Sequence, residues 1–140
     1  RTGKPATVYF QTYENNSKMI SEITNENPDI FLERELEIRK KNKLPPYQRF
    51  ISLILTGENE KKLEKEAFNF KNFIENKING KILGPVNAPI FRIKKKFRIR
   101  LLIRGSKSMK MQNSLAKIIP KYKFFKGIKL SVDVDPINFN

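Results

Sequence analysis

The sequence contains no cysteine and no histidine among its 140 residues. These absences exclude zinc fingers, thiol chemistry, disulfide scaffolds and every mechanism in which a histidine moves a proton. Phosphate-binding loops of the GxxxxGK[ST] and GxGxxG types are also missing, so the chain lacks a nucleotide-hydrolysing site of the usual kind. Any catalysis would have to use carboxylates, lysine or arginine.

Long apolar stretches are missing as well. The sequence has no run of about 18 apolar residues, and its N-terminal RTGKPATVYFQTY lacks the apolar core of a signal peptide. It therefore predicts neither membrane insertion nor export, and it indicates a reducing, cytoplasmic compartment. The length suits one domain with an appendage, and the start at Arg1 leads us to expect a piece of a longer protein.

Acidic residues are few. The chain has 14 Asp and Glu against 29 Lys and Arg, which gives a net charge of +15. Residues 1–45 carry eight basic and seven acidic side chains, whereas residues 46–140 carry twenty-one and seven. A surplus this large repels itself unless an anion binds, and nucleic acid is the default partner.

The first 45 residues are predicted to form a strand followed by two helices. β-branched and aromatic residues over Thr7–Thr12 favour a strand. The second helix has Asn27 as a cap, Pro28 in its first turn and Asp29 at the positive end of its dipole. Pro45-Pro46 cannot continue a helix, so we place the domain boundary between residues 45 and 46.

The remainder is predicted to run strand, helix, strand, strand, helix, strand. This order is the split βαβ pattern of ferredoxin-like and ribosomal-protein-like α+β domains, in which helices cover one sheet face. The expected strands are Phe50–Leu55, a segment Ile82–Val86 broken at Gly84-Pro85, a hairpin of Pro89–Ile93 and Phe97–Ile103, and Ile128–Val134; the expected helices are Glu60–Ile78 and Ser108–Ile119.

Apolar and basic residues alternate between Phe91 and Arg104, which predicts one core face and one cationic face. A three-residue connection at Lys94–Lys96 would set Ile93 opposite Phe97. Four arginines would then share one surface, and phosphate is the natural counterion of the whole run. The predicted DNA-binding residues are Arg92, Lys94, Lys95, Lys96, Arg98, Arg100, Arg104 and Lys107.

Two other interpretations of charged residues stay open. The lysines could instead protect an edge strand from pairing with another sheet. Asp133 and Asp135 are spaced to hold Mg²⁺, but the sequence supplies no third acidic partner, which favours a solvent-facing or lysine-paired strand end over a metal site. Few aromatic residues point to the cationic face, so contacts should be mainly to the phosphate backbone.

Four segments, in order, resemble the C-terminal end of the primosomal protein N-prime family, the replication-restart DNA helicases of bacteria: GKPATVYFQTY, FLERELEIRKKNKLPPYQR, ILGPVNAPIFRIKKKFRIRLLIRG and VDVDP. The resemblance implies that residues 1–45 are the tail of the second helicase lobe. It implies that residues 46–140 are a DNA-binding C-terminal domain, with a fold similar to a ribosomal small-subunit protein. It also implies that Arg1 ends the helicase motif that contacts the ATP phosphates.

The same resemblance implies a set of partners. These are branched and single-stranded DNA, the primosome loading proteins, and the acidic C-terminal tail of single-stranded DNA-binding protein, which Lys110 and Gln112 would hold. ATP with Mg²⁺ and a structural zinc are expected in the parent protein outside these residues, so this chain alone should not hydrolyse ATP. The expected location is the bacterial cytoplasm, with the nucleoid.

Three functional hypotheses follow. The first is the DNA-binding end of an ATP-dependent 3′-to-5′ helicase that recognises stalled or branched forks and initiates primosome assembly. The second is a free-standing RNA-binding domain of ribosomal-protein type, because A-form RNA is also recognised through shape and phosphates. The third is a module whose basic surface recruits an acidic peptide tail.

Overall fold

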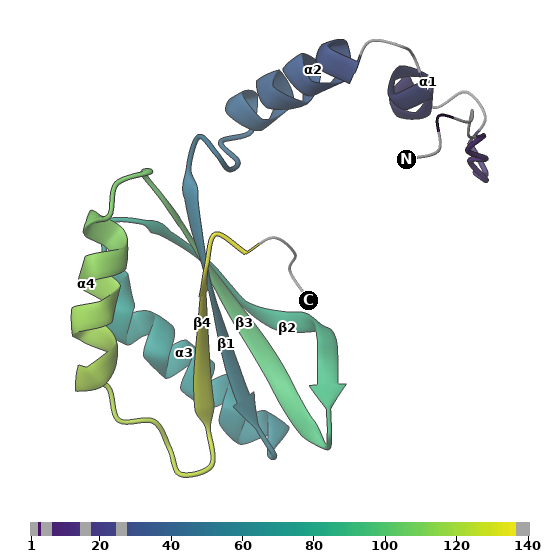
Figure 1. The fold of residues 1–140 in the computed structure, drawn as a ribbon. Helices are drawn as coiled ribbons and strands as arrows, with labels where there is room; N and C mark the ends of the chain where they lie inside the picture. Colours follow the sequence, from purple (N-terminus) through teal and green to yellow (C-terminus); the bar gives the residue numbers. More distant parts are fainter. Residues whose placement is uncertain (1–2, 4–6, 15–17, 25–27, 137–140) are drawn as a thin grey trace. The chain divides into compact units, whose positions relative to one another are not determined.

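The computed structural model describes residue 3 and residues 7–14, 18–24 and 28–136, and it divides into two compact units, residues 1–38 and 39–140. Helices α1 (Lys18–Thr24) and α2 (Pro28–Lys41) follow one another along the chain, as predicted (Figure 1). Pro28 and Asp29 lie in the first turn of α2, where the sequence predicts them, whereas the expected cap Asn27 lies outside the described residues. Within the first unit, the Arg34 guanidinium pairs with the Glu22 carboxylate at 2.7 Å.

The strand predicted over Thr7–Thr12 is wrong. These residues adopt no regular secondary structure, and Val8, Tyr9 and Phe10 are exposed to solvent. A strand is stabilised by hydrogen bonds and side-chain pairs across to a neighbour, and no strand of the described residues pairs with this segment. Local composition alone therefore does not create the strand.

The second unit contains the predicted order of strands and helices. Its sheet has the strand order β2-β3-β1-β4 with antiparallel neighbours, which is an α+β fold of the split βαβ type. The elements are β1 (Arg49–Gly57), α3 (Glu60–Glu75), β2 (Lys81–Ile93), β3 (Lys96–Gly105), α4 (Lys110–Ile118), the 3-10 turn η1 (Ile119–Lys121) and β4 (Lys129–Val134).

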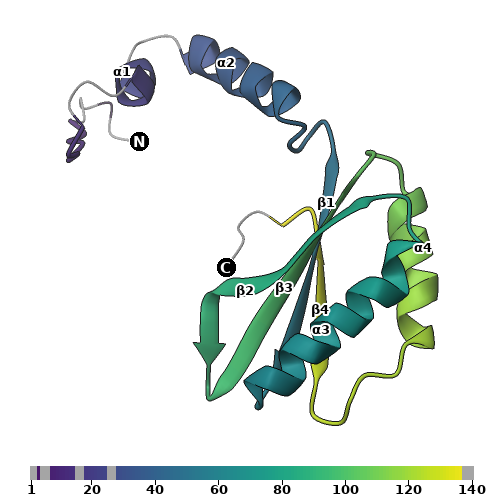
Figure 2. The same cartoon turned by 180° about the vertical axis from the view of Figure 1, so that it is seen from behind.

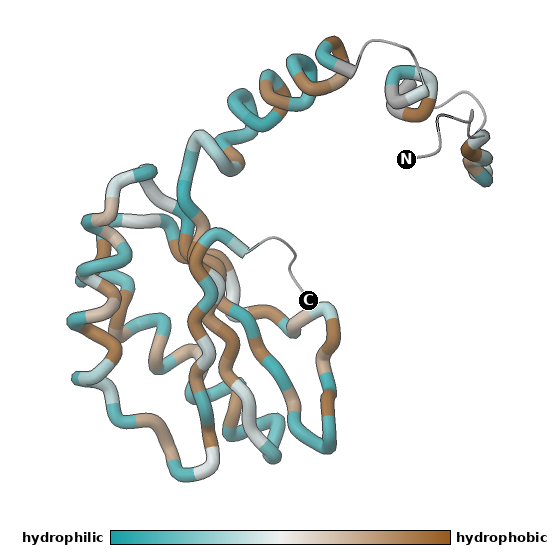
Figure 3. Tube along the Cα trace, viewed as in Figure 1, coloured by the Kyte–Doolittle hydropathy of each residue, from teal (hydrophilic) through white to brown (hydrophobic). Residues whose placement is uncertain are grey.

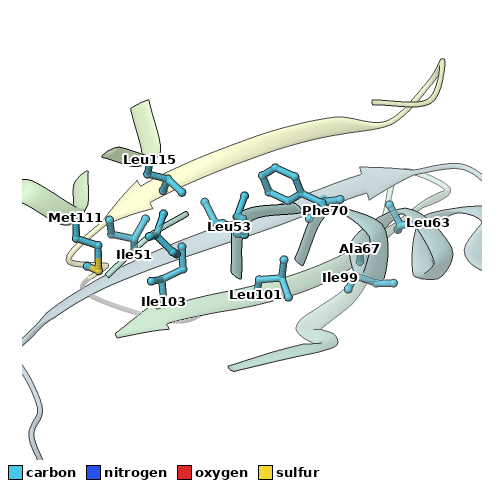
Figure 4. Packing of buried hydrophobic residues seen from close by; sticks show 13 residues of the cluster. Ile51, Leu53, Leu63, Ala67, Phe70, Ile99, Leu101, Ile103, Met111 and Leu115 are labelled. Atoms are coloured by element: carbon cyan, nitrogen blue, oxygen red, sulfur yellow. The ribbon is translucent and has the colours of Figure 1, made fainter. Parts of the chain in front are cut away.

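Both helices of this unit lie on the same face of the sheet, as the two opposite views show (Figures 1 and 2). Alternate residues of the central strands β1 and β3 point toward them and are almost completely buried. Burying each large apolar side chain stabilises the fold by about 1.5–3 kcal/mol. The core, seen closely in Figure 4, comprises Ile51, Leu53, Leu55, Leu63, Ala67, Phe70, Ile74, Ile78, Ile99, Leu101, Ile103, Met111 and Leu115.

Helix α3 is shorter than predicted. Its start is fixed by Asn59, whose side chain accepts a hydrogen bond from the Lys62 N–H at 3.0 Å. It ends at Glu75, three residues before the predicted end, because the N–H groups of Asn76 and Lys77 both turn back to the Ile74 carbonyl. Ile78 is nevertheless buried, so the apolar spacing that suggested a longer helix reflects the core rather than the helix end.

Strand β2 is not broken at Gly84-Pro85, contrary to the prediction. It runs from Lys81 to Ile93 with two shifts of register, and it tolerates proline because it lies at the edge of the sheet. Gly84 has φ +94°, and a Cβ atom there would come within 2.8 Å of the Arg100 carbonyl oxygen. Only glycine fits this first irregularity without displacing β3.

The loop after η1 is anchored to a buried carboxylate. Glu66 of α3 is 1% exposed, and its Oε1 accepts a hydrogen bond from the Phe125 N–H at 2.9 Å. Burial raises the pKa of Tyr122 above its usual 10.0, and the charge of Glu66 and a hydrogen bond to it add to the rise. Tyr122 also packs on Phe70 and Phe73 at ring centroid distances of 5.0 Å.

This pKa shift predicts a loss of stability in alkali. The folded-state pKa of Tyr122 lies above the unfolded value, so the stabilisation is complete below about pH 10 and disappears as pH rises through the folded-state pKa. Urea unfolding of the wild type and of Tyr122→Phe, compared at pH 8 and pH 11, should show the wild type losing more stability. Equal losses in the two proteins would contradict the prediction, because lysine titration is common to both.

Candidate nucleic-acid interface

The sheet face away from the helices carries a row of basic side chains. Because Ile99, Leu101 and Ile103 of β3 point into the core, the even-numbered residues of this strand point to the opposite face. Arg104 pairs across to Lys81 of β2, which extends the row to the neighbouring strand. We call this set the cationic stripe: Lys81, Lys96, Arg98, Arg100 and Arg104.

Contacts within the sheet hold part of the stripe in place. Arg98 donates a hydrogen bond from Nη1 to the Ile90 carbonyl at 3.2 Å, across the second irregularity of β2. Lys96 Nζ lies 4.0 Å from Glu58 Oε1, and both side chains are well exposed. Such a pair contributes about 0–1 kcal/mol, so it leaves Lys96 available for a stronger anionic partner.

The hairpin between β2 and β3 corrects the predicted register. Its connection has two residues, Lys94 and Lys95, so that Ile93 faces Lys96 and Arg92 faces Phe97. A shift of one residue moves a side chain to the other face, and Arg92 is therefore not aligned with Arg98, Arg100 and Arg104. Its guanidinium lies instead over the Phe97 ring, 5.0 Å from the centroid.

Both turn residues have positive φ, 48° at Lys94 and 65° at Lys95, as in the two-residue turns that match strand twist. Such turns favour Asn-Gly, which is why a pair of lysines gives no sequence signal for them. Both lysines are exposed at the tip. Figure 3 shows this hydrophilic tip directly after hydrophobic residues of β2.

The sequence analysis predicted Lys107 as a DNA-binding residue but did not predict Lys81, which belongs to the cationic stripe. Lys107, a predicted DNA ligand, lies in the turn after β3, beside a cavity of about 190 Å³ that Arg49 and Asp135 also line. Lys81 was missed, because the predicted strand began one residue later. Extending the strand Ile82–Val86 by a single position would have placed Lys81 on the cationic face.

Asp135 anchors the end of the sheet. Its carboxylate accepts hydrogen bonds from Arg49 Nε at 3.0 Å and from the Phe50 N–H at 3.1 Å, and its own N–H donates to the Phe50 carbonyl at 2.7 Å. The expected paired strand end is thus present, with arginine in place of lysine. Among the described residues, no group of three or more acidic side chains could hold a metal ion.

The two residues expected to hold an acidic tail lie at the start of α4. Lys110 is exposed, whereas Gln112 is half-buried and accepts a hydrogen bond from Arg49 Nη1 at 3.1 Å. Gln112 lines an apolar cavity of about 300 Å³ between α4 and β4, and Lys110 does not. The other lining residues are Ile51, Leu115, Ala116, Ile119, Pro120, Val132 and Val134.

Arg1, the expected nucleotide-phosphate contact, lies outside the described residues. None of the helices that the structure describes is both long and apolar enough to cross a membrane.

Comparison with known proteins places these features in a family. Residues 40–137 match the family described as the primosomal protein N C-terminal domain. The chain is 35% identical over 132 residues to the replication restart protein PriA of Rickettsia typhi, with 94% of this chain and 20% of that protein covered. Its identity to the proteins of the same name is 30% in Synechocystis sp. and 28% in Bacillus subtilis, with 100% and 97% of this chain and 17% and 18% of those proteins covered. The chain therefore spans about a fifth of the length of these relatives.

Proposed function

Because this chain belongs to the primosomal protein N C-terminal domain family, we propose that it is the DNA-binding end of a replication-restart helicase, with the cationic stripe as its DNA contact. The observation that carries the proposal is the alignment of Arg98, Arg100 and Arg104 on the open sheet face. A strand rises about 3.3 Å per residue, so Arg98 and Arg100 are about 6.6 Å apart along the strand, a spacing suited to neighbouring phosphates. An arginine guanidinium can donate two parallel hydrogen bonds to two oxygens of one phosphate.

The surroundings of the stripe favour contacts with the DNA backbone rather than with bases. Leu83, Val86 and Leu102 accompany the arginines on this face. The aromatic residue that pairs with one of these arginines, Phe50 opposite Arg104, is only 6% exposed, so its ring offers no free surface. Stacking of bases on aromatic rings, the usual mode of single-strand platforms, therefore has no support here. Phosphate contacts fix position without reading sequence, so we expect binding that is independent of sequence.

The function of the whole protein follows from family membership as a proposal. The parent is an ATP-dependent 3′-to-5′ DNA helicase that recognises stalled or branched forks and starts primosome assembly, close to the nucleoid in the bacterial cytoplasm. Residues 1–45 belong to the end of its second helicase lobe, with Arg1 near the ATP phosphates, and residues 46–140 form the DNA-binding domain. ATP, Mg²⁺, the structural zinc and the primosome loading proteins act through other parts of the parent.

Binding of forked DNA in preference to duplex RNA tests the main proposal. A labelled three-way DNA fork is titrated with the chain in fluorescence anisotropy, and unlabelled fork DNA or duplex RNA of equal length is then added as competitor. The proposal predicts that fork DNA displaces the probe at lower concentration. Stronger competition by duplex RNA would favour the ribosomal-protein-type alternative.

A second function, capture of an acidic peptide tail, is supported by the cavity beside Gln112. The cavity is apolar and can accept an apolar side chain, while Gln112 offers an amide and Lys110 a positive charge at the start of α4. A peptide that combines carboxylates with an apolar residue fits this chemistry. The acidic tail of single-stranded DNA-binding protein is the partner that we propose.

Removal of both polar groups should weaken this binding. A hydrogen bond to a charged group contributes about 1.5–3 kcal/mol, so Lys110→Ala with Gln112→Ala should weaken binding of a labelled acidic tail peptide at least about tenfold. The matched control is Lys117→Ala with Asn113→Ala, which removes one lysine and one amide from exposed positions of the same helix. Equal peptide affinity of the two variants would contradict the assignment.

A further inference from the structure

The hairpin tip combines exposed apolar side chains with lysines. Ile90 and Ile93 of β2 are 46% and 41% exposed, and Lys94 and Lys95 follow immediately in the turn. Exposed apolar residues on an edge strand are a liability that proteins usually replace with charged ones. Ile93 pairs with Lys96 of the cationic stripe, and the Ile90 carbonyl accepts a hydrogen bond from Arg98, so both isoleucines border the stripe near the end of the β2–β3 hairpin.

The backbone that carries these isoleucines is held firmly. The Phe91 and Phe97 rings pack across the hairpin with centroids 5.3 Å apart, and the Arg92 guanidinium covers the Phe97 ring. The Arg98 guanidinium donates a hydrogen bond to the Ile90 carbonyl at 3.2 Å. Isoleucine is β-branched, and its first side-chain torsion is therefore restricted. Both side chains should lose little conformational entropy when they bind a partner.

Linear duplex DNA offers phosphates to such a surface but no apolar counterpart, because its bases are stacked on one another. A branch point differs, since the last base pair before the junction exposes one face of its rings. Proteins that kink or open a duplex commonly insert Ile, Leu, Met or Phe at a base step while basic residues hold the neighbouring phosphates. The hairpin tip carries both kinds of group side by side.

We propose that Ile90 and Ile93 form an apolar wedge that packs on the exposed base pair at a DNA branch point, while Lys94, Lys95 and Lys96 hold the flanking phosphates. The wedge rests on the proposed DNA-binding function and deepens it, because it accounts for preference for branched over linear DNA. The phosphate contacts of the stripe stabilise binding to any DNA, and the isoleucines favour branched over linear DNA.

The test compares Ile90→Ala with Ile93→Ala, as a double variant, against the wild type on a three-way fork and on linear duplex of equal length. Because the isoleucines are proposed to contact only the exposed base pair of a branch point, the fork preference should fall about tenfold while linear duplex affinity stays within about twofold. A 2-aminopurine base at the junction should brighten when the wild type binds and should not when the variant binds. The control, Phe68→Ala, removes an exposed apolar side chain of α3, on the other side of the sheet from the cationic stripe, and should keep both signals.

The outcomes separate the wedge from DNA binding itself. Unchanged fork preference in a folded double variant would overturn the wedge and leave the DNA-binding proposal intact. Equal loss of affinity on fork and linear DNA would also overturn it, because the isoleucines would then act as general contacts. A wild type that binds no DNA would overturn both.

Discussion

Replacing Arg98 and Arg100 by alanine is expected to weaken DNA binding about 50-fold near 0.1 M salt, equally on all sequences, because each lost phosphate contact removes about 0.9 from the slope of log affinity against log salt. The slope itself should become shallower by about 2. Both arginines lie on the open face of β3, opposite Thr56 and Ile54 of β1, so their loss leaves the core side of the sheet unchanged. Anisotropy titrations at several salt concentrations measure both quantities.

A charge-preserving pair serves as the control. Arg98→Lys with Arg100→Lys keeps the cations and should keep most of the salt slope, although the single ammonium loses the paired hydrogen bonds of the guanidinium. Circular dichroism of all three proteins establishes that the sheet is intact. If the alanine pair folds and retains the wild-type slope, the arginines are not part of the binding surface.

Replacing Lys94 by asparagine and Lys95 by glycine should raise stability and lower DNA affinity together. Both lysines have positive φ, which costs an L-residue about 1–2 kcal/mol and is favourable for Asn-Gly. We therefore expect the free energy of unfolding to rise by about 1 kcal/mol, and DNA affinity near 0.1 M salt to fall about 50-fold through two lost phosphate contacts. Urea unfolding and anisotropy titration provide the two measurements.

Opposite signs of the two effects make this variant informative. If the lysines had a structural role, stability and DNA affinity would fall together in this variant. If they bind DNA, stability should rise while DNA affinity falls. The matched control removes two exposed lysines from α3, Lys61→Gln with Lys65→Gln, and should leave the salt slope nearly unchanged. If the control lowers the slope as much as the hairpin variant does, net charge rather than the hairpin tip determines affinity.

Much of the second unit could be predicted because its local signals agree with one another. The alternation along β3 and the spacing of Leu63, Ala67, Phe70 and Ile74 reflect the two periods of strand and helix. Both patterns are observed in the structure because their apolar side chains form the core. The segment Thr7–Thr12 has the composition of a strand, but no strand among the described residues pairs with it, and composition cannot reveal whether a pairing neighbour exists.

The register of the hairpin could not be predicted in the same way. With three consecutive lysines, the turn can be placed over two residues or three, and each choice sends Arg92 to a different face. In the structure the turn has two residues, and both turn lysines have positive φ. An Asn-Gly pair would have predicted such a turn, but two lysines do not. The remaining arginines of β3 keep their predicted face because they lie beyond the turn.

Contacts between segments that are distant in the chain could not be predicted from the sequence either. Arg49 begins β1, yet it binds Asp135 beyond β4 and Gln112 on α4, residues far apart in the chain. No local pattern marks such a meeting point, since each residue alone is an ordinary polar side chain. The same holds for the cavity beside Gln112, which exists only after α4 has packed beside β4.

The central claim, that the cationic stripe and the hairpin tip bind DNA phosphates, is tested most directly by the salt dependence of the wild-type chain on a linear duplex. The seven basic residues of this surface predict a slope of about −6 for log affinity against log salt concentration. They are Lys81, Lys94, Lys95, Lys96, Arg98, Arg100 and Arg104. A slope near this value would agree with a surface that works through phosphate contacts. A slope near zero, or no binding at low salt, would contradict the account.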